Sequence, residues 1–284
     1  MKIYHTDHFG LTLPPEHRFP SSKYSLLRQR VASSGLAGVE LLVPAAATEA
    51  QLALAHDASY VRRVLAGELS AAEVRRIGFP WSPALVERAL RSVGGTIEAS
   101  RAALAEERAA NLGGGTHHAG AGAGEGYCVF NDVAVALVDT DVHQGNGTAA
   151  IFRGDPSVYT FSLHGARNFP FRKVAGDLDI ELPDGAGDDE FLWAVEIGLR
   201  AALGHHPELV YYLAGADAHE GDRLGRLRVS RAALAERDRV VLDACQRAAV
   251  PVVVVMGGGY GRDIRDTVEI QLHSVLEAVR RSGG

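Results

Sequence analysis

Short apolar runs alternate along the chain with longer segments in which apolar residues recur at helical spacing. Several of the short runs are apolar at every position, as expected of parallel strands that are covered on both faces. They predict strands at Lys2–Tyr4, Val39–Val43, Ala109–Leu112, Leu137–Asp139, Val158–Ser162, Leu209–Ala214 and Val252–Met256, and a less apolar one at Asp179–Leu182.

The longer segments predict helices, two of which begin with recognisable start signals. Ser82 precedes a proline and Ser230 precedes a helical pattern, and serine is a preferred N-cap residue. The predicted helices are Thr48–Ala55, Ser59–Leu65, Pro83–Glu106 (loosened at Gly94 and Gly95), Asp188–Leu203, Ser230–Ala248 and Ile264–Arg280. Alternating strands and helices predict an α/β fold with a mostly parallel sheet flanked by helices, and residues 1–284 are expected to form a single domain.

Composition and charge narrow the function classes. The chain is 46% hydrophobic and 23% charged, with a net charge of −6 and no run of Lys or Arg, so a nucleic-acid surface is not expected. The first ten residues lack the apolar core of a secretion signal, and no apolar run is long enough to span a bilayer. The 2 cysteines form no disulfide framework. We therefore expect a cytoplasmic protein that acts neither on nucleic acid nor at a membrane.

Polar residues and glycines collect where five of the predicted strands end. Ligands of parallel α/β sheets bind outside the carboxyl ends of the strands, so these loops predict one site at one edge of the sheet. The five segments read GGGTHHAG, DTDVHQGNG, SLHG, GADAHEGD and GGGYGRD.

The segment DTDVH places Asp139, Asp141 and His143 at alternate positions. In an extended strand these side chains point the same way, and paired carboxylates repel unless a cation or a proton neutralises them. An oxygen and a nitrogen ligand at this spacing suit zinc or ferrous iron, with Asp217 as the third ligand and an open position for substrate. The alternative is a strand end whose polar groups are satisfied locally.

The adjacent pair His117 and His118 follows three glycines, which permit the turn that would bring both rings to one site. Next to a metal, such a pair suits base and acid work, although it also fits two structural loop histidines. Tyr260 likewise follows three glycines, and its hydroxyl either stabilises an oxyanion or covers the sheet edge. The chain has no P-loop and no nucleophile elbow.

With these residues in view, the chain resembles the histone deacetylase family, including its bacterial deacetylase and acetylpolyamine amidohydrolase members, and looks closest to the class IV branch. The matching stretches cover nearly the whole chain in order: EHRFPSSKY, IGFPWSPALVERALRSVGGT, GGGTHHA, GEGYCVFNDVAVA, DTDVHQGNGTAAIF, FSLHGARNFPF, LAGADAHEGDRLGRL and VVVMGGGYGRD. The resemblance implies the single arginase-like α/β domain of that family.

The resemblance also implies roles for individual residues. Zinc would be bound by Asp141, His143 and Asp217, with His117 as the general base and His118 as the second active-site histidine. Tyr260 would polarise the acyl carbonyl, and Asp139 would support His117 and help bind a structural potassium ion. Further potassium ligands are matched by Ser162 and Leu163, and the acyl-lysine tunnel by Gly126 and Tyr127.

Two departures from the family pattern stand out. Asn146 occupies the place of an aspartate that supports the second histidine in class I members, so we expect His118 to be less basic. In similar proteins a helix and a loop separate NDVAVA from the strand before Asp139, and here this crossover is shortened near residues 136–137. A parallel crossover usually takes at least about a dozen residues, so we expect a remodelled or defective crossover in segment 133–138.

Three functions follow from these observations. The leading one is a zinc-dependent deacylase whose substrate is an acyl-lysine peptide or protein or an acetylated polyamine. The second is a catalytically impaired or non-catalytic acyl-lysine-binding homologue, because of the shortened crossover. The third, a two-metal ureohydrolase, needs bridging carboxylates that are missing two positions after His143 and Asp217.

Overall fold

The computed structural model describes residues 1–14, 16–133 and 137–281. Within these ranges eight strands form one sheet, in which every neighbouring pair is parallel, in the order β2-β1-β3-β8-β7-β4-β5-β6. The predicted parallel α/β fold is confirmed. The strands are β1 (Lys2–Tyr4), β2 (Glu40–Leu42), β3 (Arg108–Asn111), β4 (Leu137–Asp139), β5 (Thr160–Gly165), β6 (Leu178–Leu182), β7 (Val210–Ala214) and β8 (Val252–Met256).

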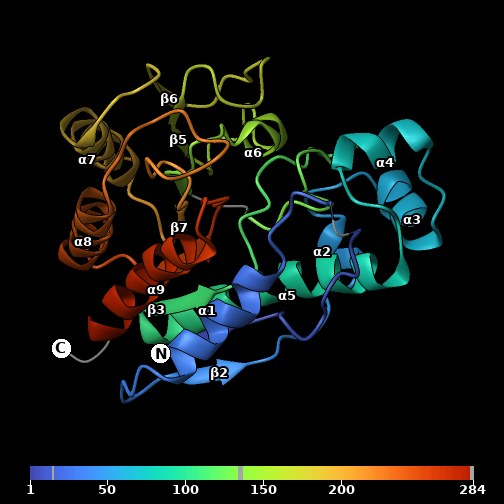
Figure 1. Ribbon diagram of the computed structural model, residues 1–284, viewed down its shortest axis with the longest axis horizontal. Helices are drawn as coiled ribbons and strands as arrows, with labels where there is room; N and C mark the ends of the chain where they lie inside the picture. The colour runs from blue at the N-terminus through green and yellow to red at the C-terminus, as the bar shows by residue number, and fades with distance from the viewer. Residues whose placement is uncertain (15, 134–136, 282–284) are drawn as a thin grey trace.

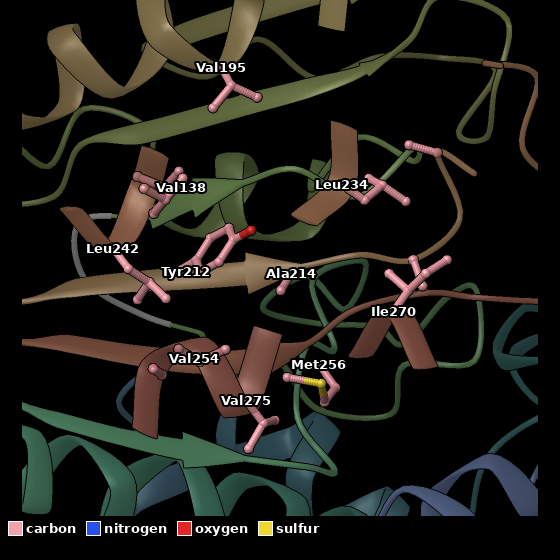
Figure 2. Packing of buried hydrophobic residues seen from close by; sticks show 14 of the residues in the cluster. Val138, Val195, Tyr212, Ala214, Leu234, Leu242, Val254, Met256, Ile270 and Val275 are labelled. Carbon is pink, nitrogen blue, oxygen red and sulfur yellow. The ribbon is translucent and has the colours of Figure 1, made fainter. Parts of the chain in front are cut away.

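Helices cover both faces of the sheet. One face carries α1 (Ser22–Ala32), α7 (Asp188–Gly204), α8 (Arg231–Arg247) and α9 (Ile264–Arg280). Figure 2 shows the core on this side, where Val138, Tyr212 and Val254 of neighbouring strands lie among side chains from α7, α8 and α9. The other face packs against α5 (Pro83–Glu106). Burial of the strands on both sides explains why their sequences are apolar at consecutive positions.

Helix α5 runs without interruption through Gly94 and Gly95, so the predicted loosening at this pair is wrong. Both glycines are buried, and a Cβ at Gly94 would meet the Ala45 carbonyl while one at Gly95 would lie about 2.9 Å from the Asn111 side chain. The glycines thus let the helix approach a loop and strand β3 closely. Around the N-terminal half of α5, and away from α7 and α8, gather α2 (Glu49–Leu52), α3 (Ala58–Ala66) and α4 (Ala71–Ile77).

The sequence missed three helices. Helix α1 lies in a serine-rich, charged segment, α4 has only seven residues, and α6 (Asn146–Ile151) starts directly after a loop glycine. Strand β5 also starts later than predicted and extends to Gly165. The two predicted serine caps are confirmed, since the Ser82 and Ser230 hydroxyls each accept a hydrogen bond from a backbone N–H three residues later.

The predicted shortening near residues 136–137 falls largely on residues 134–136, which lie outside the described residues. On one side of this gap, Val133 is fully buried on the sheet face that packs against α5. On the other side, β4 pairs in parallel with β7 and β5, and Asp139 lies opposite Leu213 and Ser162. Among the described helices, none is long and apolar enough to cross a membrane.

Candidate metal centre and active site

The carboxyl ends of the strands surround a cavity of about 490 Å³. The loops after β3, β4 and β8 supply polar lining residues, and Asp217 from the loop after β7 lies beside them. Strand β5 contributes differently from the prediction, because its His164 is buried away from the cavity and the loop beyond it supplies Phe169 instead. The predicted strand ends therefore do meet at one cavity, where four of them contribute polar residues and the loop after β5 contributes an aromatic one.

Asp141, His143 and Asp217 bring their donor atoms within 4.8 Å of one another. His143 Nδ1 lies 3.0 Å from Asp141 Oδ1 and 3.1 Å from Asp217 Oδ2. All three residues are almost fully buried, with the exposed fraction of the residue reaching 9% only at His143. The three residues that the sequence grouped as metal ligands thus converge on one point.

The alternation of an extended strand is not what aligns these residues, which corrects the prediction. Strand β4 ends at Asp139, and the chain then turns. Asp139 Oδ1 accepts a hydrogen bond of 3.0 Å from the Asp141 N–H, and Asp141 Oδ1 accepts one of 3.0 Å from the His143 N–H. Each aspartate therefore bonds the backbone two residues on, as aspartates do in Asx turns.

The pKa values of these buried residues indicate that the two carboxylates favour a positive charge between them. Burial and the neighbouring Asp141 carboxylate raise the pKa of Asp217 to about 7. Burial alone would lower the pKa of His143, but its hydrogen bonds to the two carboxylates raise it to about 10. A buried divalent cation would take over the role of that imidazolium, and two oxygens with one nitrogen suit zinc or ferrous iron. The donor set fits such an ion.

His117 lies next to this group and is held by Asp139. Its Nδ1–H donates to Asp139 Oδ2 at 2.6 Å, so Nε2 is left facing Asp141 Oδ1 at 3.9 Å. Burial would lower the pKa of His117, but the Asp139 carboxylate outweighs it and raises the pKa to about 9. A cation at Asp141 would repel the imidazolium and bring this pKa down towards neutrality.

His118 lies beside His117, with the two ring centroids 4.1 Å apart and the ring planes tilted by 48°, and the chain turns just before them at Gly115, which has a φ of +80°. Its Nδ1 is 2.7 Å from Asn146 Oδ1. Burial holds the pKa of His118 well below its usual range, and the neighbouring His117 lowers it further. An amide partner cannot oppose this as a carboxylate would, in keeping with the lower basicity expected from Asn146.

Tyr260 lines the same cavity and is 9% exposed. Asp222 Oδ2 accepts a hydrogen bond of 2.6 Å from its backbone N–H, which fixes the end of the GGGY loop. In the same loop the Gly258 N–H donates to Asp141 Oδ2, and a side chain at Gly258 would clash with Asp217. Burial raises the pKa of Tyr260 well above its usual range, so its hydroxyl stays protonated as a donor.

The remaining predicted residues lie in two places, the lining of the cavity and strand β5. Gly126 and Tyr127 line the cavity, with the Tyr127 ring centroid 6.2 Å from that of Tyr260. Ser162 pairs with Asp139 in the sheet register, and Leu163 is fully buried beside it. The potassium site assigned to Asp139, Ser162 and Leu163 stays a prediction.

Sequence reasoning missed several residues of the site. Lys23 of α1 is 2% exposed, lines the cavity and places its Nζ 3.4 Å from the Gly257 carbonyl oxygen. Its helix was not predicted, so no signal pointed to it. Asp132 lies under the histidine loop and accepts hydrogen bonds from the N–H groups of Gly115 and Thr116. Its position directly before an apolar run was visible in the sequence, but its partners were not.

A second group of possible metal donors, His5, Asp7 and His8, lies at the end of β1. Here the Asp7 carboxylate already has partners, because Arg28 Nε lies 2.7 Å from one oxygen and His5 Nδ1 lies 2.7 Å from the other. The Arg28 guanidinium already supplies the positive charge that a metal ion would bring, so this group is a weaker candidate for a metal site than the buried group of Asp141, His143 and Asp217.

A model of the histone deacetylase domain matches residues 17–275 of the 284-residue chain. The chain belongs to the histone deacetylase family. The resemblance seen in the sequence is thus confirmed, and so, at the level of the family, is the prediction of a hydrolase-type enzyme.

Individual relatives match most of this chain. An uncharacterised protein of Picosynechococcus sp. is 42% identical, over 98% of this chain and 97% of its own. Histone deacetylase 2 of Arabidopsis thaliana is 30% identical, over 89% of this chain and 73% of its own. The crystal structure of an acetylpolyamine aminohydrolase from Burkholderia pseudomallei has a TM-score of 0.77 at 21% identity, over 98% of each chain. Because its sequence identity is low, the match to the Burkholderia structure shows only that the present chain has the same fold.

Proposed function

We propose that this chain is a metal-dependent deacylase that hydrolyses the amide of an acylated lysine side chain or of an acetylated polyamine. Zn²⁺ or Fe²⁺ is the proposed metal, K⁺ the proposed structural ion, and the cytoplasm the proposed compartment. The single observation that carries the proposal is the convergence of Asp141, His143 and Asp217 beside the His117–His118 pair at one cavity.

The chemistry divides among the residues as follows. A divalent cation held by Asp141, His143 and Asp217 would supply Lewis acidity, which polarises the acyl carbonyl and makes water easier to deprotonate. His117 accepts the proton of the attacking water at Nε2, because Asp139 fixes the tautomer that leaves this nitrogen free. That proton then passes to the leaving amine, and His118, the second histidine of the pair, assists this transfer.

The acyl oxygen gains negative charge as water attacks, and a donor placed there lowers the barrier. The buried Tyr260 hydroxyl supplies this hydrogen bond, and its raised pKa keeps the proton on the phenol. The backbone of Tyr260 is held by Asp222, so the donor is positioned before the substrate arrives. Burial of the whole group strengthens each of these interactions.

Metal content and turnover, measured together, test the proposal. We expect about one zinc or iron per purified chain by mass spectrometry, and metal-dependent release of acetate from acetyl-lysine peptides. Asp217→Asn should lose both metal and activity, whereas Asp189→Asn, on the exposed start of α7, should lose neither. Folded protein that stays free of metal when zinc and iron are supplied would contradict the proposal. Folded, metal-loaded protein that binds acyl-lysine without hydrolysing it would support the non-catalytic alternative.

A further inference from the structure

Helix α4 places two arginines at the mouth of the cavity. Arg75 and Arg76 lie in its last turn and line the cavity. The helix end is tied to the tunnel loop, because the Gly126 N–H donates to the Arg76 carbonyl at 3.2 Å and the Tyr127 N–H donates to the Ile77 carbonyl at 2.7 Å. The position of the two arginines is therefore fixed relative to Gly126 and Tyr127, the residues that would line the entry path of an acyl chain.

The charges around the cavity are unbalanced. Among the described lining residues, the fixed cations are Lys23, Arg75, Arg76 and Arg88, and the carboxylates are Glu125 and Asp141. Asp141 belongs to the metal group. Glu125, the remaining carboxylate, accepts a hydrogen bond of 3.2 Å from the Asn146 amide. The mouth is thus cationic on a chain whose net charge is −6.

The two arginines are also free to meet a ligand. Both are exposed, and in the part of the chain that the structure describes neither has a carboxylate within 4.0 Å. On the same helix, by contrast, Glu73 is engaged by Arg63 at 2.8 Å. Basic residues do favour a helix C-terminus, which accounts for the sign of the charge on α4. It does not account for Arg88 and Lys23, which come from α5 and α1 and line the same cavity.

Resting on the proposed function, we infer that Arg75 and Arg76 select substrates with a carboxylate close to the acylated amine. A polyamine or a lysine-rich tail would bring like charges to this mouth, and like-charge contacts suppress binding of the wrong partner. The carboxylate would come either from Asp or Glu residues that flank an acyl-lysine in a protein or from the carboxylate of a free N-acyl amino acid.

Paired substrates on the metal-loaded full chain test this inference. The first pair is an acetyl-lysine peptide flanked by Glu and the same peptide flanked by Lys; free Nε-acetyl-lysine and N-acetylspermidine form the second pair. We expect kcat/KM to be about three- to tenfold higher for the acidic peptide at low salt, since exposed charge pairs contribute modestly, and the ratio to approach one at high salt. A preference for free Nε-acetyl-lysine over the acidic peptide would identify the small-molecule source of the carboxylate.

Charge reversal supplies the decisive comparison. The double variant Arg75→Glu/Arg76→Glu should invert the preference, whereas Arg101→Glu/Arg247→Glu, with the same charge change at exposed positions outside the cavity, should keep it. Equal or better turnover of the Lys-flanked peptide or of N-acetylspermidine by the unmodified chain would overturn the inference, as would an unchanged preference after reversal.

Binding of the same two peptides, followed by fluorescence anisotropy, separates this inference from the proposed function. Without turnover, a binding preference for the acidic peptide that inverts in the Arg75→Glu/Arg76→Glu variant would retain the inference and reject the deacylase. Equal binding of both peptides would reject the inference whether or not the chain hydrolyses them.

Discussion

The Asp132 carboxylate lies 2.7 Å from the backbone nitrogen of Thr116, the residue that precedes His117. It also accepts hydrogen bonds from the hydroxyls of Thr116 and Thr96, at 2.6 and 2.5 Å, and from the Gly115 N–H at 3.2 Å. A carboxylate can accept all of these at once because it carries only acceptors. The conformation of the histidine loop thus depends on one buried residue that never reaches the cavity.

Asp132→Asn turns part of this acceptor into a donor that faces other donors. We expect the free energy of unfolding to fall by about 1–3 kcal/mol, the cost of an unsatisfied buried group. Displacing His117 by about an ångström would lower kcat/KM by about 10²-fold. Denaturant unfolding and deacylase assays check both. The matched control is Asp155→Asn, where an exposed carboxylate accepts from the Ser157 N–H and hydroxyl, and it should change neither quantity appreciably.

Tyr260→Phe removes the proposed oxyanion donor and keeps the ring. We expect kcat to fall by about 10²–10³-fold, because that is the usual cost of losing one such donor. Metal content should stay the same, since the proposed ligands Asp141, His143 and Asp217 are left unchanged. Tyr159→Phe, which removes a partly buried phenol outside the cavity, serves as the control. Unchanged turnover in Tyr260→Phe would remove this residue from the mechanism.

A fully buried ion pair lies beneath the Asp217 loop. Arg237 Nη2 is 2.9 Å from Asp238 Oδ1, and Arg237 Nη1 donates to the Gly215 carbonyl at 2.5 Å. Arg237→Met would leave Asp238 buried without its cation, so we expect a loss of about 3–5 kcal/mol in unfolding free energy. Arg239→Met, two residues on, breaks only exposed pairs with Glu236 and Asp243 and should cost about 1 kcal/mol or less. Equal losses of unfolding free energy in the two variants would show that burial does not set the contribution of the Arg237–Asp238 pair to stability.

His164 predicts how stability responds to acid. Burial lowers its pKa from 6.5 to about 4, and its Nε2 has no hydrogen-bond partner among the described residues. Between these two pH values the unfolded chain binds a proton that the folded chain does not, so stability falls as pH drops through that window. The difference of 2.5 units corresponds to up to about 3 kcal/mol.

Urea titrations at several pH values measure this slope. His164→Asn should flatten it between pH 6.5 and about 4, where the pKa values of the unfolded and folded states lie. His206→Asn provides the control, because His206 is exposed and asparagine tolerates its positive φ of 54°. A slope that persists in His164→Asn would assign the acid sensitivity to other groups.

The sequence predicted those features that depend on local pattern. The apolar strands, the serine caps of α5 and α8 and the collection of polar residues at strand ends all follow from spacing along the chain. The choice of Asp217 succeeded in position because parallel strands bring their carboxyl ends to one edge of a sheet. The turn after Asp139 was missed, since side-chain hydrogen bonds to the backbone replace strand geometry there.

Features that depend on distant partners were beyond sequence reasoning. The charged mouth arises because α4 is tied to Gly126 and Tyr127, some fifty residues further along the chain. Lys23 reaches Gly257 from near the other end of the chain. The glycine pair in α5 looked like a weak point because glycine disfavours helices, whereas close packing against Ala45 and Asn111 requires it.

The position of β8 in the sheet determines how late in synthesis the fold of the enzyme can be completed. This strand, Val252–Met256, is the last along the chain, yet it lies between β3 and β7 and joins the first three strands to the other four. His117 and His118 follow β3 on one side of that seam, and Asp141, His143 and Asp217 belong to the other. We therefore expect that a nascent chain on the ribosome cannot assemble the proposed catalytic group until β8 has been synthesised, and that a product truncated before residue 252 would lack deacylase activity.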